Sequence, residues 1–111
     1  MSTTLRVVHG TLQYVEFAVS LTDAQGAAVD PTGDAVAVAV RPWQDLSTAL
    51  SYQAATWVTD TSGAAPVYYA RILVGQAPFD LAPGLYRVYV RVTDTPEHPV
   101  LDDWLLYVAA G

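Results

Sequence analysis

The sequence contains no cysteine and no lysine, and it has only two histidines. Without cysteine, the chain can form no disulfide bond, no thiolate metal site and no cysteine nucleophile. Because lysine is absent, five arginines carry all of the basic charge against eleven carboxylates, and the net charge is −6. Basic side chains supply most of the affinity for phosphate backbones, so we expect no nucleic-acid partner.

Long apolar runs are also missing. No segment approaches the ~20 consecutive apolar residues that a membrane helix needs, and the first residues lack the basic start and apolar stretch of a signal peptide. We therefore expect no membrane partner. Apolar residues make up 52% of the 111 residues and charged residues only 14%, which is typical of a folded chain. This length predicts a single domain spanning 1–111.

Alternation of apolar and polar residues is the dominant pattern in the chain. It is clearest at residues 85–93, where Val88 and Val90 alternate with Arg87, Tyr89 and Arg91. Successive side chains of a strand lie on opposite faces. The alternation therefore predicts a strand whose valines face the core and whose arginines and tyrosine face solvent or a partner.

The same alternation predicts strands in several other segments. They are residues 5–9, 11–21, 34–41, 67–74 and 100–109, and a short strand around Trp57. Turn-forming prolines and glycines separate the segments. About seven short strands predict an all-β fold, a single antiparallel β-sandwich of immunoglobulin-like (Ig-like) architecture. Residues 43–53 are open between a loop, a helical turn capped by Asp45 and an irregular strand.

Side chains capable of catalysis are few and isolated. A Ser-His-acid triad needs a histidine within hydrogen-bond reach of a serine. His9 precedes a glycine at a predicted strand end, His98 lies in a turn before proline, and neither neighbours a Gly-x-Ser-x-Gly motif. No carboxylate pair stands out for acid–base catalysis. We expect no enzyme activity, no catalytic residue and no cofactor.

Carboxylates near the end of the sequence are the one candidate metal site. Asp102 and Asp103 approach Asp94 and Glu97 if the last two strands form a hairpin, and calcium prefers oxygen ligands. The spacing matches no calcium loop, however, and adjacent residues of a strand point to opposite faces. We favour solvated aspartates that discourage edge pairing, and we expect no metal.

Arginines and tyrosines on outward faces form the main candidate surface. Two strands carry them, and they form one patch if both strands lie in the same sheet. The residues are Tyr69, Arg71, Arg87, Tyr89 and Arg91. Both residue types are enriched in protein interfaces. In the alternative, which we favour on sequence, the arginines cover neighbouring tyrosines and pair with carboxylates such as Glu16.

Tryptophans and the two terminal strands add further candidates. Trp104 is predicted to fill the core, whereas Trp43 is either a lid on the sandwich or an anchor for a partner. The strands at 5–9 and 100–109 are each candidates for edge pairing with the sheet of another chain.

Three segments carry a resemblance to a known family. They are DPTGDAV at residues 30–36, ARILVG at 70–75 and LAPGLYRVYVRVTDTPEHPV at 81–100. They resemble small virion proteins of tailed phages of actinobacteria. The early segment is also loosely similar to the Ig-like amino-terminal domain of phage baseplate upper proteins. The likeness covers most of the chain from Tyr14 onward and is weakest at 43–53.

The resemblance implies a non-enzymatic structural protein of the phage head or neck, made in the host cytoplasm. The expected function is a capsid decoration or minor capsid protein that docks on the major capsid protein in a homo-oligomeric or symmetric array. One alternative is a head-to-tail or tail (baseplate) component bound to neck proteins. Another is a carbohydrate-binding or host-adhesion module with Trp43 and Trp57 as its sugar platform. The expected partner-binding residues are Tyr69, Arg71, Arg87, Tyr89, Arg91 and Trp43.

Overall fold

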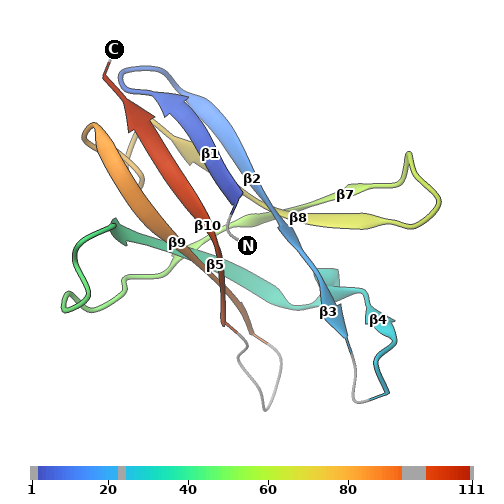
Figure 1. Cartoon of the computed structure of the whole chain (residues 1–111). Coiled ribbons are helices and arrows are strands. Elements are labelled where there is room, and N and C mark those ends of the chain that lie inside the picture. Colours follow the sequence, from blue (N-terminus) through green and yellow to red (C-terminus); the bar gives the residue numbers. More distant parts are fainter. Residues whose placement is uncertain (1–2, 23–24, 94–99, 111) are drawn as a thin grey trace.

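Two β-sheets pack against each other in the computed structural model, which describes residues 3–22, 25–93 and 100–110 (Figure 1). Sheet A has the strand order β1-β10-β9-β5-β6, and sheet B has the order β2-β8-β7. Sheet A consists of β1 (Thr3–Val8), β10 (Val100–Ala109), β9 (Gly84–Thr93), β5 (Ala35–Pro42) and β6 (Gln53–Ala54). Sheet B consists of β2 (Gln13–Val19), β8 (Val67–Val74) and β7 (Thr56–Asp60).

A small hairpin and a single helical turn complete the described elements. The hairpin pairs β3 (Leu21–Thr22) with β4 (Ala28–Val29), and the 3-10 turn η1 (Pro31–Gly33) leads into β5. The Asp30 carboxylate accepts a hydrogen bond from the Thr32 backbone N–H and caps this turn. No described helix is long and apolar enough to cross a membrane.

The strand pairing confirms the all-β expectation and corrects its details. The described residues form ten strands, of which seven have five or more residues, and they belong to three sheets rather than to one simple sandwich. Most pairs are antiparallel, but β1 runs parallel to β10. The parallel pair arises because β1 and β2, although consecutive, lie in different sheets, so no hairpin makes β1 antiparallel to its neighbour.

The predicted alternation appears most clearly in β9. Val88, Val90 and Val92 are fully buried, whereas Arg87 and Arg91 on the opposite face are only half-buried. Strands β8 and β10 begin and end where the sequence predicted them, at 67–74 and 100–109. The other expected strands differ from the described ones by one or a few residues at their ends.

The core lies between the inner faces of the two sheets. Its largest fully buried side chains include Phe17 of β2 and Leu106 of β10. Trp104 is 6% exposed, and its ring centroid lies 5.6 Å from that of Phe17, which confirms its predicted core position. Each such large apolar side chain contributes about 1.5–3 kcal/mol through burial. The alternation in β2, β8, β9 and β10 is therefore what joins the two sheets.

Sheet order also decides which strands have a free edge. Strand β10 lies between β1 and β9, so it is an inner strand, and the expectation that residues 100–109 could pair with another sheet is wrong for most of its length. From Trp104 to Val108, β10 is paired with β1 on one side and with β9 on the other. Strand β1 lies at the edge of sheet A and keeps one unpaired side.

Candidate functional site

The predicted arginine and tyrosine patch is divided between the two sheets. Strand β8 carries Tyr69 and Arg71 in sheet B, whereas β9 carries Arg87, Tyr89 and Arg91 in sheet A. The condition for a single patch, that both strands share a sheet, is therefore not met. The alternating residues of both strands point away from the common core, so the two groups lie on opposite sides of the molecule.

On sheet B, the arginine is satisfied by its own neighbours. The Arg71 guanidinium lies 4.7 Å from the centre of the Tyr14 ring, and its Nε donates to the Glu16 carboxylate at 3.1 Å. Glu16 and Arg71 are directly opposite each other on β2 and β8. For this arginine, the sequence interpretation of tyrosine cover and carboxylate pairing is correct.

On sheet A, two arginines meet directly across neighbouring strands. Arg41 of β5 is opposite Arg87 of β9, and like charges in this position repel. Both guanidinium groups are directed to carbonyl oxygens of the loop that follows β5. Arg41 Nη1 donates to Thr48 O at 2.9 Å, and Arg87 Nε donates to Trp43 O at 3.2 Å. The repulsion is thus offset by hydrogen bonds that hold the loop.

Aromatic rings cover the three guanidinium groups of this face. The pairs, with the distance from the guanidinium carbon to the ring centre, are Arg87 with Trp43 (3.9 Å), Arg91 with Tyr52 (4.1 Å) and Arg41 with Tyr89 (5.2 Å). All three lie within the range of cation–π attraction. Trp43 and Tyr52 come from the two ends of the loop, so stacking fixes both ends on the sheet.

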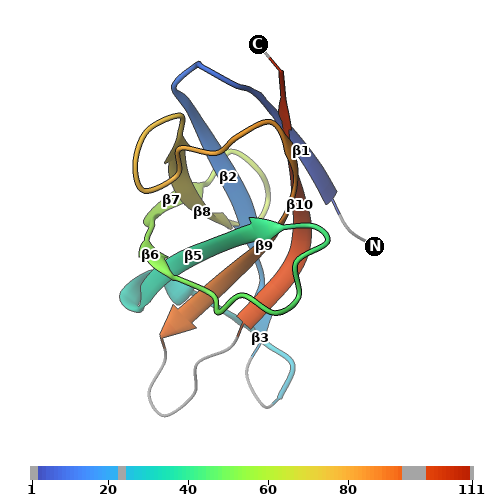
Figure 2. The same cartoon turned by 90° about the vertical axis from the view of Figure 1, so that its left-hand side faces the viewer.

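We call residues 43–52 the β5–β6 loop. Figure 2 shows it running from the end of β5 back across the sheet to β6. Its contacts with Arg41, Arg87 and Arg91 place it over the outer face of sheet A. Ala39 of β5 is fully buried although it alternates with core-facing valines. The β5–β6 loop therefore shields part of the outer face of sheet A from solvent.

Asp45 determines the shape of the loop. Its carboxylate accepts hydrogen bonds from the backbone N–H groups of Ser47 and Thr48 and from both hydroxyl groups. These bonds, led by the one from the Thr48 side chain, hold the pKa of Asp45 well below its ordinary value of 3.8. Of the three possibilities left open by the sequence, the segment is a loop with turns that ends in β6, and Asp45 caps no helix.

Tyr52 lies among the charged groups of this face. Burial raises the pKa of its phenol above the ordinary value of 10.0, while the positive charges of Arg91 and Arg41 oppose that rise. Tyr89 adds a smaller upward effect. Tyr52, at the end of the loop, is therefore protonated and neutral near pH 7.

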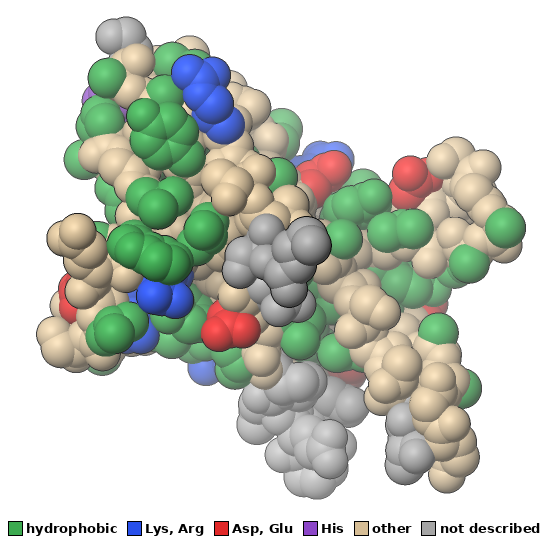
Figure 3. Space-filling view, viewed as in Figure 1, with side chains coloured by type: hydrophobic (Ala, Val, Ile, Leu, Met, Phe, Trp, Pro, Cys, Tyr) green, Lys and Arg blue, Asp and Glu red, His purple; other side chains and the backbone are tan. Residues whose placement is uncertain are grey.

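The outer face of sheet A is unusual for this acidic chain. Within the described residues, the one ion pair joins Arg71 to Glu16, and none involves Arg41, Arg87 or Arg91. Arg41 Nε and Arg91 Nε are buried without a hydrogen-bond partner. In the space-filling view, arginine side chains lie among hydrophobic ones on the left (Figure 3). This face concentrates positive charge beside apolar surface.

A hollow of about 460 Å³ lies beside the start of the β5–β6 loop. Its lining is mainly apolar and includes Pro42, Trp43, Pro83, Leu85 and Tyr86. Its volume falls within the usual range of ligand pockets.

Exposed apolar side chains lie on the loop next to this hollow. Trp43 is 39% exposed and Leu46 is 66% exposed. Leu46 was missed in the sequence, although an isolated leucine between polar residues after Asp45 is a signal that could have identified it.

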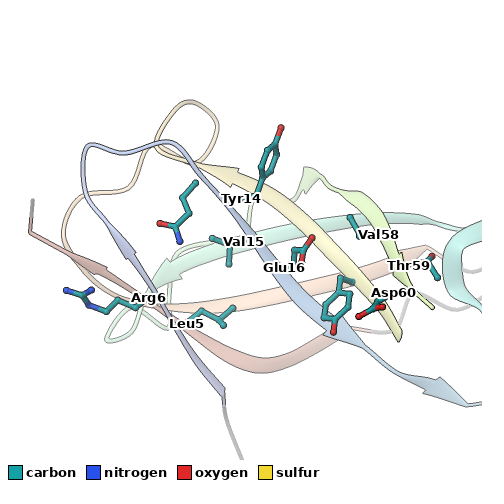
Figure 4. Close-up of a pocket in the computed structure, with 10 residues that line it drawn as sticks. Leu5, Arg6, Tyr14, Val15, Glu16, Val58, Thr59 and Asp60 are labelled. Carbon is teal, nitrogen blue, oxygen red and sulfur yellow. The ribbon is translucent and has the colours of Figure 1, made fainter. Parts of the chain in front are cut away.

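A larger groove of about 600 Å³ lies along β1, β2 and β7 (Figure 4). The Glu16 carboxylate of the groove already accepts a hydrogen bond from Arg71. The other charged side chains, Arg6 and Asp60, lie at opposite ends of the labelled group (Figure 4). Leu5 and Val15 contribute apolar surface between them. The groove lacks the small set of converging polar groups that a catalytic pocket requires.

The proposed sugar platform is not formed. Trp57 packs against the core from β7, and its Nε1–H donates to the Asp34 carbonyl at 2.7 Å, just before β5 begins. Trp43 follows the last residue of β5. Eight strand residues at ~3.3 Å each separate the two tryptophans by roughly 25 Å. They cannot present one flat surface to a glycan.

The candidate metal ligands and the second histidine lie partly outside the described residues. The structure does not describe Asp94, Glu97, His98 or the side chain of Asp103. Among the described side chains, no group of three histidine, aspartate or glutamate residues could hold a metal ion. His9 is exposed, and its Nδ1 lies 3.1 Å from the carbonyl oxygen of Leu81.

No protein-family model, curated protein or solved structure matches this chain.

Proposed function

We propose that this chain is a non-enzymatic structural protein of a phage virion. In this proposal it is a capsid decoration or minor capsid protein that docks on the major capsid shell and stabilises the particle. The support from sequence is the resemblance of residues 30–36, 70–75 and 81–100 to small virion proteins.

The finer fold in this proposal is an Ig-like β-sandwich. Sheet A, with the order β1-β10-β9-β5-β6, is analogous to an Ig sheet whose C, F and G strands are β5, β9 and β10, with two added strands, β1 and β6. Sheet B, with the order β2-β8-β7, is analogous to the opposite B, E and D strands. Such domains use one sheet face or the loops at one end for contacts, while the core maintains their shape.

One observation carries the docking role: the outer face of sheet A combines unpaired arginines with exposed apolar side chains. Arg41, Arg87 and Arg91 have no ion pair among the described residues. Trp43 and Leu46 are exposed on the loop above them. Tryptophan and arginine are the residue types that most often dominate binding energy in interfaces. In a symmetric array, many such weak contacts act together through avidity.

Mass spectrometry of purified particles tests the proposal by counting this chain against the major capsid protein. A decoration protein occupies symmetric sites over the shell, so we expect on the order of hundreds of copies per particle. A count of about a dozen or fewer indicates a ring in the neck or tail and overturns the decoration role. Complete absence from the particle overturns the virion role.

A matched pair of variants locates the contact face. Arg87→Ala combined with Arg91→Ala is expected to lower occupancy on the particle while the domain stays folded. Arg71→Ala removes a stacked arginine from the opposite sheet and is expected to leave occupancy unchanged. Equal losses from the two changes would argue that sheet A is not the docking face.

A further inference from the structure

The arginines of sheet A support the β5–β6 loop more than they face a partner directly. Arg41 uses both of its terminal nitrogens, one on Thr48 O and one on the Tyr89 hydroxyl. Arg91 has no hydrogen bond to a described residue, and it stacks on Tyr52 at the end of the loop away from the hollow. Arg87 differs from both because its Nε is bonded to Trp43 O and its guanidinium stacks on Trp43, which lines the hollow. Its two terminal nitrogens have no hydrogen bond to any described residue.

Arg87 therefore presents an edge suited to a carboxylate. Its flat side is stacked on the Trp43 ring at 3.9 Å, which orients the guanidinium plane. A guanidinium held in this way offers two parallel N–H donors to one carboxylate. The contacts with Trp43 fix this geometry before any partner arrives, so less conformational entropy is lost on binding.

The same tryptophan also lines the apolar hollow. Trp43 and Leu85 line it, and the Tyr86 hydroxyl that borders it is already bonded to Ala82 O at 2.7 Å. Gln44 supplies the one side-chain amide of the lining, and the other side chains that line the hollow are mainly apolar. The hollow suits an apolar side chain, and Leu46 adds exposed apolar surface two residues beyond its rim.

We propose that this hollow and Arg87 together bind an extended acidic segment of a partner protein. One large apolar side chain of the segment enters the hollow against Trp43, and a carboxylate next to it in sequence pairs with Arg87. The partner's identity as a capsid protein rests on the proposed function, but the chemistry of the segment rests on this site alone.

Charge complementarity favours this occupant over the others. Two copies of this chain meeting through the same face would bring two sets of three arginines together. The carboxylate of the β5–β6 loop, Asp45, already accepts hydrogen bonds from Ser47 and Thr48 within its own loop. A free phosphate would use Arg87 but leave the apolar hollow unoccupied. Nucleic acid is disfavoured by the net charge of −6. An acidic protein segment uses both halves of the site.

The proposal is tested by titrating short peptides into the 111-residue chain. Binding is monitored through the NMR signals of the Trp43 indole N–H and the Arg87 Nε–H. The probes are acetyl-Glu-Phe-Glu-amide, acetyl-Lys-Phe-Lys-amide and acetyl-Glu-Ser-Glu-amide. We expect the first peptide to shift both signals saturably and to bind about tenfold or more tightly than either control. Equal binding of the three peptides, or no shift at these two signals, overturns the proposal.

Two variants separate the site from the fold. Arg87→Gln is expected to abolish the preference for the acidic peptide over the basic one, whereas Arg71→Gln on sheet B leaves it unchanged. The three-peptide comparison on the unmodified chain remains decisive if Arg87→Gln does not fold. Sedimentation velocity adds another outcome: self-association lost in Arg87→Gln would show that a second copy occupies the face, and it would overturn the acidic segment.

Particle analysis keeps this inference distinct from the proposed function. Selective peptide binding by a chain that is absent from particles removes the virion role and retains the binding site. Incorporation into particles without selective peptide binding removes the binding site and retains the virion role.

Discussion

The two outer faces of the molecule use the same residue types to different ends. On sheet B, Arg71 is stacked on Tyr14 and neutralised by Glu16. On sheet A, Arg87 is stacked on Trp43 but bonds to a loop carbonyl instead of a carboxylate. On sheet B, the arginine contacts are all made by residues of neighbouring strands. On sheet A, the arginines contact the β5–β6 loop, and they have no ion pair with a described residue.

An arginine that stacks on an aromatic ring therefore takes its role from its cross-strand neighbour. On β8, the cross-strand neighbour is a carboxylate, so the arginine forms an ordinary surface pair. On β9, the cross-strand neighbour of Arg87 is another arginine, so the charge must find other partners. The carbonyls and rings of the β5–β6 loop are those partners, and the loop becomes ordered as a consequence.

The largest expected effect is the loss of Arg41. Arg41→Ala removes two hydrogen bonds from a half-buried charged group and the stacking on Tyr89. We expect the free energy of unfolding to fall by about 2 kcal/mol, as is typical for hydrogen bonds to charged groups. Urea denaturation measures the change.

Arg6→Ala is the matched control for Arg41. Arg6 is exposed on β1 and stacks on no described aromatic ring. Its replacement is expected to change the free energy of unfolding by no more than about 0.5 kcal/mol. Equal costs for the two variants would contradict a supporting role for Arg41.

A smaller effect distinguishes the two kinds of arginine contact. A double-mutant cycle between Arg87 and Trp43 is expected to give a coupling of about 1 kcal/mol. The cycle between Arg71 and Glu16 is expected to give about 0.5 kcal/mol, because both side chains are about one-third exposed, at 35% and 37%.

The salt dependence of the two coupling energies further distinguishes the two contacts. Raising the ionic strength to about 1 M should weaken the Arg71–Glu16 coupling by screening, and it should change the Arg87–Trp43 coupling much less. A larger salt effect on the Arg87–Trp43 pair would show that its attraction is not mainly stacking.

The smallest expected effect is the pH response of the β5–β6 loop. Because hydrogen bonds lower the pKa of Asp45 in the ordered loop, a disordered loop binds the proton more tightly. The contribution of Asp45 is therefore fully present above its ordinary value of 3.8 and is lost as the pH falls below it. We expect the NMR signal of the Trp43 indole to be constant from pH 7 to about pH 5 and to change in more acidic solution.

Asp45→Asn provides the control for this titration. The amide keeps one oxygen acceptor but cannot titrate, so the acid-induced change at Trp43 should disappear. A change that persists in Asp45→Asn, or that begins near pH 6 in the unmodified chain, would assign the response to another group.

Local alternation was enough to predict most strands and the side chains that they bury. The valines of β9 and Trp104 of β10 lie in the core because a strand alternates its faces whatever its neighbours are. The all-β character follows from the same period. For the same reason, the outward direction of Arg71, Arg87 and Tyr89 could be inferred without a structure.

The candidate site was only partly predictable. The sequence identified Trp43, Arg87 and Arg91, but it missed Leu46 and placed Tyr69 and Arg71 in the same patch. Whether two strands share a sheet depends on long-range pairing, which no local pattern encodes. The hollow beside Trp43 depends equally on Pro83 and Leu85, some forty residues along the chain.

Most strands, their inward faces and the acidic balance of the chain follow from local sequence, because each depends on composition or on neighbours one or two residues away. Long-range packing was needed to place β8 and β9 in opposite sheets, to make β10 an inner strand and to set β1 parallel to it. The contacts of Arg41, Arg87 and Arg91 with the β5–β6 loop also depend on the tertiary structure. These outcomes depend on contacts between residues far apart in the chain, where packing of the whole core selects one arrangement among several that the local pattern allows.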